Sequence, residues 1–396
     1  MSPQTGSRPL RVAFLDIGGA TWAAGPHYLR NLFLAIKSLD APASIEITLL
    51  VPDGKPSGSE SILGPCVDQQ IAVPFWHRAV LRIQQQLGVR LPIEPPLATL
   101  LRRRHVDAIF ANRDFGPQFP IPSLSWIPDF QHVRLPEMFS AQEIRSRDRE
   151  FSRIAAYATR VIVSSRDACR DFQSFAPQAA HRARVMPFVA QVPGDIYDAD
   201  PSQLCEQYRL PRAFFYLPNQ FWKHKNHAVV IEALRLARAS RPDIAVVCSG
   251  RTVDDRHPQY FPELQERLTA FGLGDNVIIL GVIPHAHVYQ LMRQAVAVLQ
   301  PSLFEGWSTS VEETKSVGKR ILLSDIPVHR EQDPPHGVFF DPHDPAALAR
   351  CLTTTLAECR PGPDLELEAA ARSHLPARTR KFGETFAAIV REVKDG

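Results

Sequence analysis

Short apolar runs alternate with amphipathic helical patterns along the chain. In the first half, the pattern predicts a helix at residues 26–37 and strands at residues 11–17, 45–51, 106–111, 123–127 and 161–164. In the second half, it predicts strands at residues 214–217, 244–249, 277–280, 295–299 and 320–324, and helices at residues 226–239, 262–271, 285–294, 309–317 and 345–356. Strands that alternate with helices in this way favour parallel sheets covered by helices on both faces.

The periodicity lapses around residues 187–211, where proline, glycine and aspartate accumulate as in a linker. The chain has 396 residues, which is too long for one ordinary core. We therefore predict an α/β protein with two Rossmann-like parallel-sheet domains, residues 1–195 and 196–376, that face a central cleft. A last helix within residues 377–396 is expected to cross back to the first domain.

Composition narrows the class of protein. Hydrophobic residues make up 44% and charged residues 22%, as in globular proteins, and a net charge of +3 is too small to indicate a nucleic-acid partner. The six cysteines form no CxxC pair, so we expect reduced thiols rather than disulfides or a zinc site. Neither a signal-peptide layout nor an apolar stretch of about 20 residues is present, so a cytoplasmic location is expected.

A basic segment at residues 76–104 contains six arginines and a single acid, Glu94. Its first part, residues 76–89, has the periodicity of an amphipathic helix. One interpretation is a helix that packs on its own sheet and exposes a basic face. The other is peripheral contact with an anionic membrane surface, which suits tryptophan and arginine on one helix.

The stretch at residues 300–319 follows a predicted buried strand and leads through a loop into a helix. Glu305 lies in the loop, and Glu313 lies about one turn into the helix. The unpaired N–H groups of a first helical turn, here near Thr309 and Ser310, favour an anion such as a phosphate. Carboxylates beside them can accept hydrogen bonds from sugar hydroxyls. Phosphate and sugar together indicate a nucleotide-sugar.

Three other loops follow predicted strands, where ligands bind in open parallel sheets. The loop at residues 218–227 contains Lys223 and Lys225, which could neutralise a diphosphate, although a solvated lysine loop is the simpler interpretation. The loop at residues 126–137 offers Asp129 and His132 to hold a sugar hydroxyl or act on a proton. The loop at residues 18–25 is rich in glycine but lacks the G-x-G-x-x-G fingerprint.

The segments PNQFWKHKNH, SGR, LGVIPHAHVYQLM and PSLFEGWSTSVEE occur in this order in the second half. Together they resemble the second domain of the family-4 retaining glycosyltransferases of GT-B architecture, whose E-x7-E signature corresponds to Glu305 and Glu313. In the first half, GGATWAAGPHYLRNL resembles the family's glycine loop and first helix. SWIPDFQHVRLPEMF resembles a segment of bacterial members that build surface polysaccharides, including mannosyl- and rhamnosyltransferases.

The resemblance implies a role for several residues. Glu313 would bind the nucleotide ribose, Glu305 the donor sugar, and Lys225 the diphosphate. The full set of implied donor-binding residues adds Gly25, Asn219, Lys223, Arg251, Val282, Ile283, Ser308, Thr309 and Ser310. The implied acceptor-binding residues are His132 and Arg134, and Asp129 joins Glu305 and Lys225 as a candidate catalytic residue.

Three positions depart from the family pattern. Asn219 stands where an arginine is common, Pro128 where a histidine is common, and Ser308 where a glycine is usual. An aspartate pair of the kind that binds metal in other transferases, Asp198 and Asp200, lies in the predicted linker and is interpreted as part of a turn. We predict no metal and no cofactor beyond the nucleotide-sugar co-substrate.

The sequence thus predicts a retaining, metal-independent glycosyltransferase that moves a hexose or deoxyhexose to a glycan or lipid-linked acceptor. Bacterial polysaccharide synthesis, such as that of lipopolysaccharide, is the expected context, with GDP-mannose or GDP-rhamnose preferred as donor. A nucleotide-sugar epimerase or phosphorylase of the same architecture is one alternative. A catalytically silent protein that binds a sugar nucleotide or a glycan is another, motivated by Asn219 and Pro128.

Overall fold

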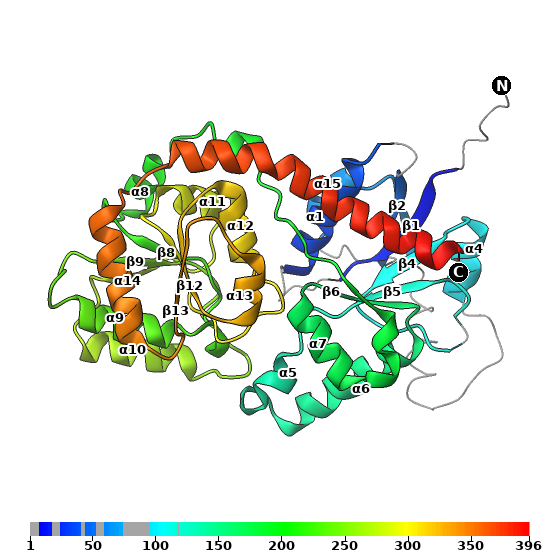
Figure 1. The fold of residues 1–396 in the computed structure, drawn as a ribbon, viewed down its shortest axis with the longest axis horizontal. Helices are drawn as coiled ribbons and strands as arrows, with labels where there is room; N and C mark the ends of the chain where they lie inside the picture. Colours follow the sequence, from blue (N-terminus) through cyan, green and yellow to red (C-terminus); the bar gives the residue numbers. More distant parts are fainter. Residues whose placement is uncertain are drawn as a thin grey trace. The chain divides into compact units, whose positions relative to one another are not determined.

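A computed structural model of the chain describes residues 8–17, 24–40, 44–52, 59–73, 96–117 and 119–395. The chain divides into two units (Figure 1). The N-terminal unit comprises Met1–Phe130, Arg145–Val189 and Ala377–Gly396, and the C-terminal unit comprises Gln131–Ile144 and Ala190–Pro376. The predicted helix at residues 76–89 and residues 18–23 of the glycine loop lie outside the described residues, so the basic segment is described only from residue 96.

The N-terminal unit contains a parallel sheet with the strand order β3-β2-β1-β4-β5-β6-β7. Its strands are β1 (Leu10–Leu15), β2 (Ile45–Pro52), β3 (Gln69–Val73), β4 (Ala108–Ala111), β5 (Ser123–Trp126), β6 (Arg160–Val163) and β7 (Ala183–Val185). Its helices are α1 (Ala24–Lys37), α2 (Glu60–Leu63), α4 (Pro96–Arg103), most of α6 (Ala141–Tyr157), α7 (Arg166–Phe175), the 3-10 turns η1 (Gly64–Cys66) and η3 (Pro177–Arg182), and the end of α15 (Leu365–Asp395).

One face of this sheet is covered by α1 and the end of α15 through aromatic packing. Phe14 of β1 meets Phe33 of α1 at a ring-centroid distance of 4.8 Å and Phe386 of α15 at 5.7 Å. A Cβ on Gly383 of α15 would lie 2.4 Å from the Ala35 carbonyl oxygen, so only glycine permits the close approach of these two helices. Because strand side chains alternate between faces, the neighbouring positions of β1 and β4 pack with α4 on the other face.

The C-terminal unit contains a parallel sheet with the order β10-β9-β8-β11-β12-β13. Its strands are β8 (Phe215–Leu217), β9 (Val246–Cys248), β10 (Val277–Ile279), β11 (Val298–Gln300), β12 (Ile321–Ser324) and β13 (Gly337–Phe340). Its helices are α5 (Gln131–Arg134), α8 (Ser202–Tyr208), α9 (His227–Ala237), α10 (Tyr260–Ala270), α11 (His285–Gln294), α12 (Thr309–Val317), α13 (Pro327–Gln332) and α14 (Pro345–Glu358), with the turns η2 (Pro136–Met138), η4 (Gly194–Ile196) and η5 (Lys223–Lys225).

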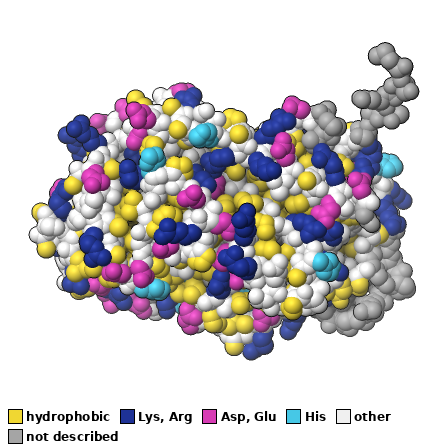
Figure 2. Space-filling model, viewed as in Figure 1, with side chains coloured by type: hydrophobic (Ala, Val, Ile, Leu, Met, Phe, Trp, Pro, Cys, Tyr) yellow, Lys and Arg dark blue, Asp and Glu magenta, His cyan; other side chains and the backbone are white. Residues whose placement is uncertain are grey.

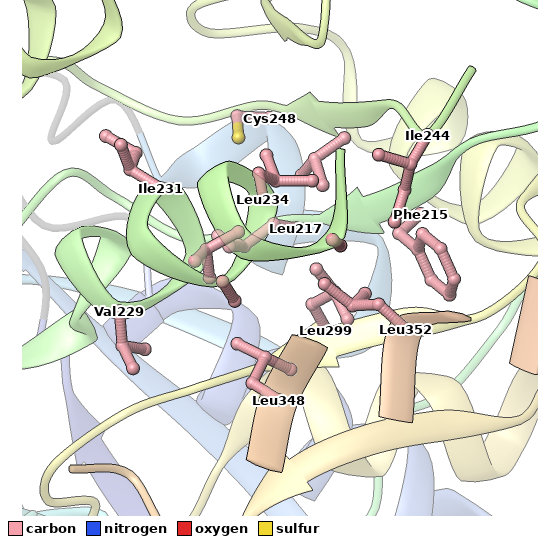
Figure 3. Close-up of a cluster of buried hydrophobic side chains, with 14 of the residues drawn as sticks. Phe215, Leu217, Val229, Ile231, Leu234, Ile244, Cys248, Leu299, Leu348 and Leu352 are labelled. Atoms are coloured by element: carbon pink, nitrogen blue, oxygen red, sulfur yellow. The ribbon is translucent and has the colours of Figure 1, made fainter. Parts of the chain in front are cut away.

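Two apolar clusters hold this second sheet between its helices. On one face, α9, α10 and α14 bury side chains against the strands, and Figure 3 shows Leu348 and Leu352 of α14 close to Leu299 and Phe215 of the sheet. On the other face, α11 and α12 pack against alternate strand residues such as Tyr216 and Val298. Each fully buried large apolar side chain contributes about 1.5–3 kcal/mol to the free energy of unfolding.

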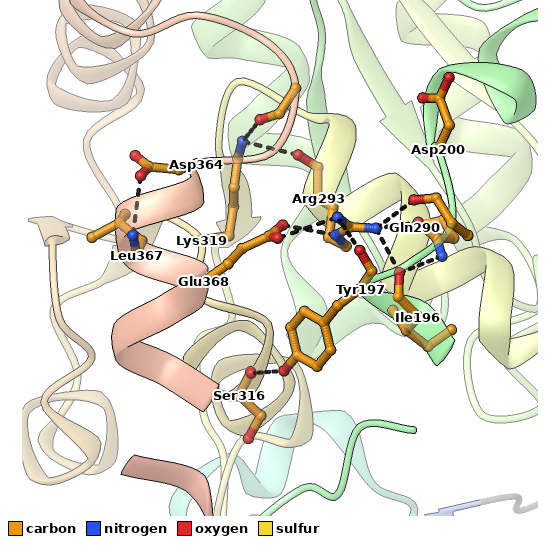
Figure 4. Close-up of polar contacts among 12 residues, drawn as sticks. Ile196, Tyr197, Asp200, Gln290, Arg293, Ser316, Lys319, Asp364, Leu367 and Glu368 are labelled. Carbon is orange, nitrogen blue, oxygen red and sulfur yellow. Dashed lines mark hydrogen bonds and ion pairs between the residues drawn. The ribbon is translucent and has the colours of Figure 1, made fainter. Parts of the chain in front are cut away.

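A buried polar network ties together the ends of the C-terminal unit (Figure 4). The Arg293 guanidinium is paired with the Glu368 carboxylate at 2.7 Å, and it donates hydrogen bonds to the carbonyl oxygens of Ile196, Tyr197 and Ala199. The Lys319 ammonium donates to the carbonyl oxygens of Arg293 at 3.0 Å and Gly362 at 2.6 Å. The Arg293 guanidinium therefore connects the segment before β8, at residues 196–199, to Glu368 at the start of α15.

The predicted strands and helices that fall within the described residues all have counterparts there, with two corrections to the expected element ends. The last helix begins at Leu365 rather than near residue 377, because Pro376 lies inside α15 instead of before it. The predicted linker at residues 187–211 is partly structured, since it contains η4 and α8, and Ile196 is buried in the core. Helix α6 has no counterpart in the prediction because most of its positions are polar.

No helix in the described part of the chain combines the length and the apolar content that crossing a bilayer requires. On the face shown in Figure 2, basic and acidic side chains are interspersed, as the small net charge of +3 leads one to expect. The six cysteines are all free thiols.

The buried lysine gives a testable pH dependence. Burial lowers the pKa of Lys319 to about 8 from an ordinary value of 10.5, so between these pH values the unfolded chain binds more protons than the folded one. The free energy of unfolding of the wild type should therefore rise, relative to that of Lys319→Met, between pH 8 and 10.5. At full titration the gain is on the order of 3 kcal/mol.

Urea unfolding of both proteins at pH 7 to 10.5 measures this difference. Lys381→Met, which removes an exposed lysine of α15, serves as the control. The quantity compared is the free energy of unfolding of the wild type minus that of Lys319→Met. A value that stays constant or falls as the pH rises from 8 to 10.5 would contradict the prediction.

Candidate functional site

The order of strands in the C-terminal unit puts a topological switch point between β8 and β11. After β8 the chain passes through α9 to β9 on one side, and after β11 it passes through α12 to β12 on the other. Helices α9 and α12 pack on opposite faces of the sheet. Ligands of open parallel sheets bind at such a switch point, beyond the carboxyl ends of the strands. The loops that follow β8 and β11 are the ones that contain Lys225 and Glu305.

Lys225 and Glu305 form an ion pair at this point. Lys225 Nζ donates to Glu305 Oε1 at 2.6 Å, and the two side chains are only 13% and 9% exposed. Asn226 holds the loops together because its amide donates to the carbonyl oxygens of Pro301 at 3.1 Å and Pro342 at 2.9 Å. The Leu303 N–H adds a hydrogen bond to the His224 carbonyl oxygen at 2.8 Å. The pair is therefore fixed by the backbone on both sides.

The start of α12 lies directly after Glu305. Glu312 N–H is the first donor inside the helix and reaches the Ser308 carbonyl oxygen at 3.2 Å, so the N–H groups of Thr309 and Ser310 precede the intrahelical ladder. The Gln332 amide of α13 exchanges two hydrogen bonds with the Ser308 backbone, at 3.0 and 3.1 Å. This arrangement fixes the helix start and leaves its first N–H groups suited to an anion.

Ser308, which stands where the family usually has glycine, has an ordinary backbone conformation. Its φ is −78°, so no glycine is required there, and its side chain is fully buried. The Ser308 hydroxyl accepts a hydrogen bond from Gln300 Nε2. The Ser308 side chain is therefore buried, and its hydroxyl is hydrogen-bonded to Gln300.

Asn219 occupies the position where the family commonly has arginine, and it is 3% exposed. Its amide donates to Gln300 Oε1, and its own oxygen accepts from the Ser310 hydroxyl at 3.3 Å. Asn219 therefore supports the loop and the helix start but supplies no charge. Gln300 was not among the predicted site residues, because a glutamine at the end of a buried strand has no sequence signal of its own.

Glu313 lies in α12 and is paired with a residue that the sequence did not single out. His285 Nε2, at the start of α11, lies 2.7 Å from Glu313 Oε1. The predicted base contacts precede this histidine in the chain: Val282 is 77% exposed, whereas Ile283 packs partly against the core. The structure therefore brings Glu313 together with the loop after β10.

The two remaining cations of the predicted donor site differ in their surroundings. Arg251 is paired with Asp255 at 3.1 Å, while the Lys223 side chain is exposed. The Lys223 backbone N–H donates to the carboxylate of Asp254, which is buried, at 3.0 Å. The loop after β8 is thus tied to the loop after β9.

Two buried histidines near Lys225 do not add charge at neutral pH. Burial, assisted by Lys225, lowers the pKa of His227 to about 3. Burial also lowers the pKa of His329 to about 4, with Glu305 opposing and Lys225 assisting the shift. Lys225 therefore provides the fixed positive charge of this cluster.

The predicted residues of the first half are divided between the units. Asp129 belongs to the N-terminal unit and accepts from Arg147 at 3.1 Å. His132, which is buried, and Arg134, which is exposed, belong to the C-terminal unit through Gln131–Ile144. Gly25 is a buried residue of α1.

The segment Gln131–Ile144 is held by the loop after β9. The guanidinium of Arg256 lies 4.5 Å from the centroid of the Phe139 ring, and His257 Nε2 lies 3.1 Å from the Met138 carbonyl oxygen. Among the described residues, no three neighbouring His, Cys, Asp or Glu side chains are arranged to hold a metal ion.

Comparison with known proteins places this geometry in context. Residues 208–369 match the family model described as glycosyl transferases group 1. A search of curated proteins gave no match. Three similar solved structures share less than 25% sequence identity with this chain, so their likeness concerns the fold alone.

HepE of Anabaena, in complex with UDP and glucose, has a TM-score of 0.65 and 18% identity, with 98% of each chain covered. A glycosyltransferase from Rickettsia africae has a TM-score of 0.65 and 14% identity, with 98% of this chain and 99% of that chain covered. Sucrose-phosphate synthase from Thermosynechococcus elongatus has a TM-score of 0.61 and 17% identity, with 97% and 94% covered. The predicted GT-B fold, with its two parallel-sheet α/β units, is confirmed.

A glycine in the loop after β9 gives a testable constraint on this site. Gly250 has a φ of 142°, and a Cβ there would lie 2.5 Å from the Asn219 carbonyl oxygen. Gly250→Ala should therefore displace the loop after β8 and lower the free energy of unfolding by about 1–3 kcal/mol. Nucleotide affinity should fall as well, because Lys225 lies in that loop.

Gly274→Ala is the matched control, since nothing lies within 4 Å of the added Cβ. Thermal unfolding and calorimetric titration with UDP and GDP measure the two effects. Equal stability and equal nucleotide affinity of Gly250→Ala and Gly274→Ala would contradict the prediction.

Proposed function

We propose that this protein is a retaining, metal-independent glycosyltransferase that uses a nucleotide-sugar donor. The observation that carries the proposal is the part-buried Lys225–Glu305 pair beside the start of α12, at the switch point of the second sheet. A cation and free N–H groups suit a diphosphate, and a carboxylate suits the sugar attached to it. The match to glycosyl transferases group 1 covers these residues and supports the same function.

Each part of the site receives a role in this proposal. Lys225 and the N–H groups of Thr309 and Ser310 bind the diphosphate, with Lys223 and Arg251 contributing charge nearby. Glu305 binds hydroxyls of the donor sugar. Glu313, oriented by His285, binds the ribose hydroxyls, because a carboxylate paired on one oxygen retains acceptor capacity on the other.

The transfer step needs no fixed nucleophile. The bond between the sugar's anomeric carbon and the leaving phosphate oxygen breaks as the acceptor oxygen bonds to the same carbon on the same face. The acceptor's proton passes to the departing phosphate oxygen, so charge is balanced without a metal. The protein's main contribution is to stabilise negative charge on the leaving diphosphate, which Lys225 and the start of α12 are placed to do.

The donor base is proposed from two sources. Val282 and Ile283 would contact the base. The sequence resemblance favours GDP-mannose or GDP-rhamnose, whereas HepE of Anabaena, which shares the fold, is known in complex with UDP-glucose. We therefore propose UDP- and GDP-sugars as the first donors to test.

The acceptor is proposed to be a glycan or a lipid-linked glycan of a bacterial surface polysaccharide. His132 and Arg134 are the proposed acceptor contacts, and Asp129 is the proposed group that orients the acceptor hydroxyl. Peripheral contact with an anionic membrane through the basic segment at residues 76–104 would bring a lipid-linked acceptor to the enzyme.

One observation favours a second candidate, a protein that binds a sugar nucleotide without turnover. Asn219 replaces a common arginine and is locked into neutral hydrogen bonds, so the site has one cation fewer than the family pattern. The two functions are separated by nucleotide release: acceptor-dependent release of UDP or GDP supports transfer, and binding without release supports the silent protein.

Removal of the proposed diphosphate ligand tests the donor site. Lys225→Met should weaken the affinity for the nucleotide-sugar by about 10- to 100-fold, because a charge-assisted hydrogen bond is worth about 1.5–3 kcal/mol. Lys381→Met, which removes an exposed lysine on α15, should leave this affinity unchanged. Calorimetric titration measures both variants, and unchanged affinity in Lys225→Met would remove Lys225 from the diphosphate site.

Removal of the carboxylate charge tests the sugar contact. Glu305→Gln keeps the size of the side chain, so the affinity for UDP or GDP should stay within about threefold. The rate of transfer should fall by about 100-fold or more, as expected when an interaction made chiefly in the transition state is lost. Coupled detection of released nucleotide measures kcat, and a loss of nucleotide affinity equal to the loss of rate would contradict the assignment.

A further inference from the structure

Gln300, the last residue of β11, is a fully buried amide in contact with four side chains of the site. Its Nε2 donates to Glu305 Oε1 at 3.1 Å and to the Ser308 hydroxyl. Its Oε1 accepts from the Asn219 amide, and the Ser302 hydroxyl lies 3.5 Å away. Both ends of the amide are therefore used, and its orientation is determined.

The orientation of Glu305 depends on this amide. The hydrogen bonds to the carboxylate in the described part of the chain, from Lys225 and from Gln300, both end on Oε1. A carboxylate held by two donors on one oxygen presents its other oxygen to a ligand. The rotation of the Glu305 side chain is thereby fixed before any sugar arrives.

The two donors to Glu305 differ in what happens when a diphosphate binds. Lys225 is the proposed diphosphate ligand, so its ammonium becomes shared between phosphate oxygens and the carboxylate. Gln300 is neutral and fully buried, so it is not itself a ligand for the phosphate charge. Its hydrogen bond persists whichever partner Lys225 takes, and it is therefore the contact able to keep Glu305 in place in the loaded site.

The same amide connects Glu305 to the start of α12. The backbone of Ser308 is fixed by Gln332, and the hydroxyl of Ser308 accepts from Gln300. A glycine at position 308 would offer no such acceptor. The presence of serine here is thus explained by the glutamine, and the two residues act together.

We infer that Gln300 is a positioning residue that sets the Glu305 carboxylate for the donor sugar and, through Ser308, couples the sugar contact to the phosphate site. The inference rests on the proposed function and deepens it. It assigns Gln300 to recognition of the sugar part of the donor, not of the nucleotide part.

The test measures the affinity that the sugar adds. Dissociation constants are determined by calorimetry for three pairs: UDP and UDP-glucose, GDP and GDP-mannose, and dTDP and dTDP-rhamnose. For the pair that binds, the sugar ratio is the dissociation constant of the free nucleotide divided by that of the nucleotide-sugar. Gln300→Met keeps the volume of the side chain and removes its hydrogen bonds. In this variant the sugar ratio should fall by about 5- to 10-fold, because the nucleotide-sugar binds more weakly. Affinity for the nucleotide alone should stay within about twofold.

Two further variants separate positioning from simple stability. Gln290→Met also removes a buried amide of the same unit, one that donates to the Ile196 carbonyl oxygen, and it should leave the ratio unchanged. In a Glu305→Gln background, Gln300→Met should have no additional effect on the ratio, because the group it positions is already altered.

Gln300→Glu adds a pH-dependent readout. At pH 8 the introduced carboxylate repels Glu305 and the sugar ratio should be at its lowest. Protonation of the introduced carboxyl on acidification would restore a donor toward Glu305, so the ratio should recover as the pH falls. A stability defect alone would not recover in this way.

The outcomes are distinct. Wild-type protein that binds none of the nucleotide pairs would overturn the proposed function and this inference with it. Wild-type protein that binds a pair, with an unchanged ratio in Gln300→Met or an equal change in Gln290→Met, would overturn the inference alone. An effect of Gln300→Met that is undiminished in the Glu305→Gln background would also overturn it.

Discussion

The ion pair between Lys225 and Glu305 is the interaction on which the rest of the site depends. Both side chains are largely removed from solvent, and a buried charge without its partner would cost several kcal/mol. Removal of either side chain would leave the other charge unpaired, so the two loops that carry them must meet. The hydrogen bonds of Asn226 and of the Leu303 N–H keep them together, so the charges are in place before a ligand binds.

Much of the fold could be predicted from the sequence because its signals are local. Short apolar runs predicted most of the strands, though not β3, β7 and β13, and helical periodicity predicted many of the helices. Their alternation indicated two parallel sheets. The spacing of Glu305 and Glu313 across a loop and one helical turn indicated a site after a strand. The loop with Lys225 was equally visible, because cationic residues follow the first strand of the second unit. What the structure adds is that Lys225 and Glu305 are partners.

The residues that orient this site could not be predicted in the same way. Gln300, Gln332 and His285 are single polar residues on elements distant in sequence from the groups they contact, so no local pattern identifies them. Pro376 is a further case, since proline usually ends a helix, yet α15 continues through it. Polar partners and helix ends are decided by packing, which periodicity does not report.

The Arg293–Glu368 network has a consequence for how such a protein can be recombined. The family match begins at residue 208, yet Arg293 donates to backbone oxygens of Ile196, Tyr197 and Ala199, which precede that point. A gene fusion that joined a foreign partner at residue 208 would delete these acceptors and leave a buried guanidinium short of hydrogen bonds. The unit that could be exchanged runs from Ala190 to Pro376. It also includes the segment Gln131–Ile144, which lies earlier in the chain. The chain crosses between the two units at four points, so exchange of C-terminal units between relatives would have to respect four boundaries rather than one.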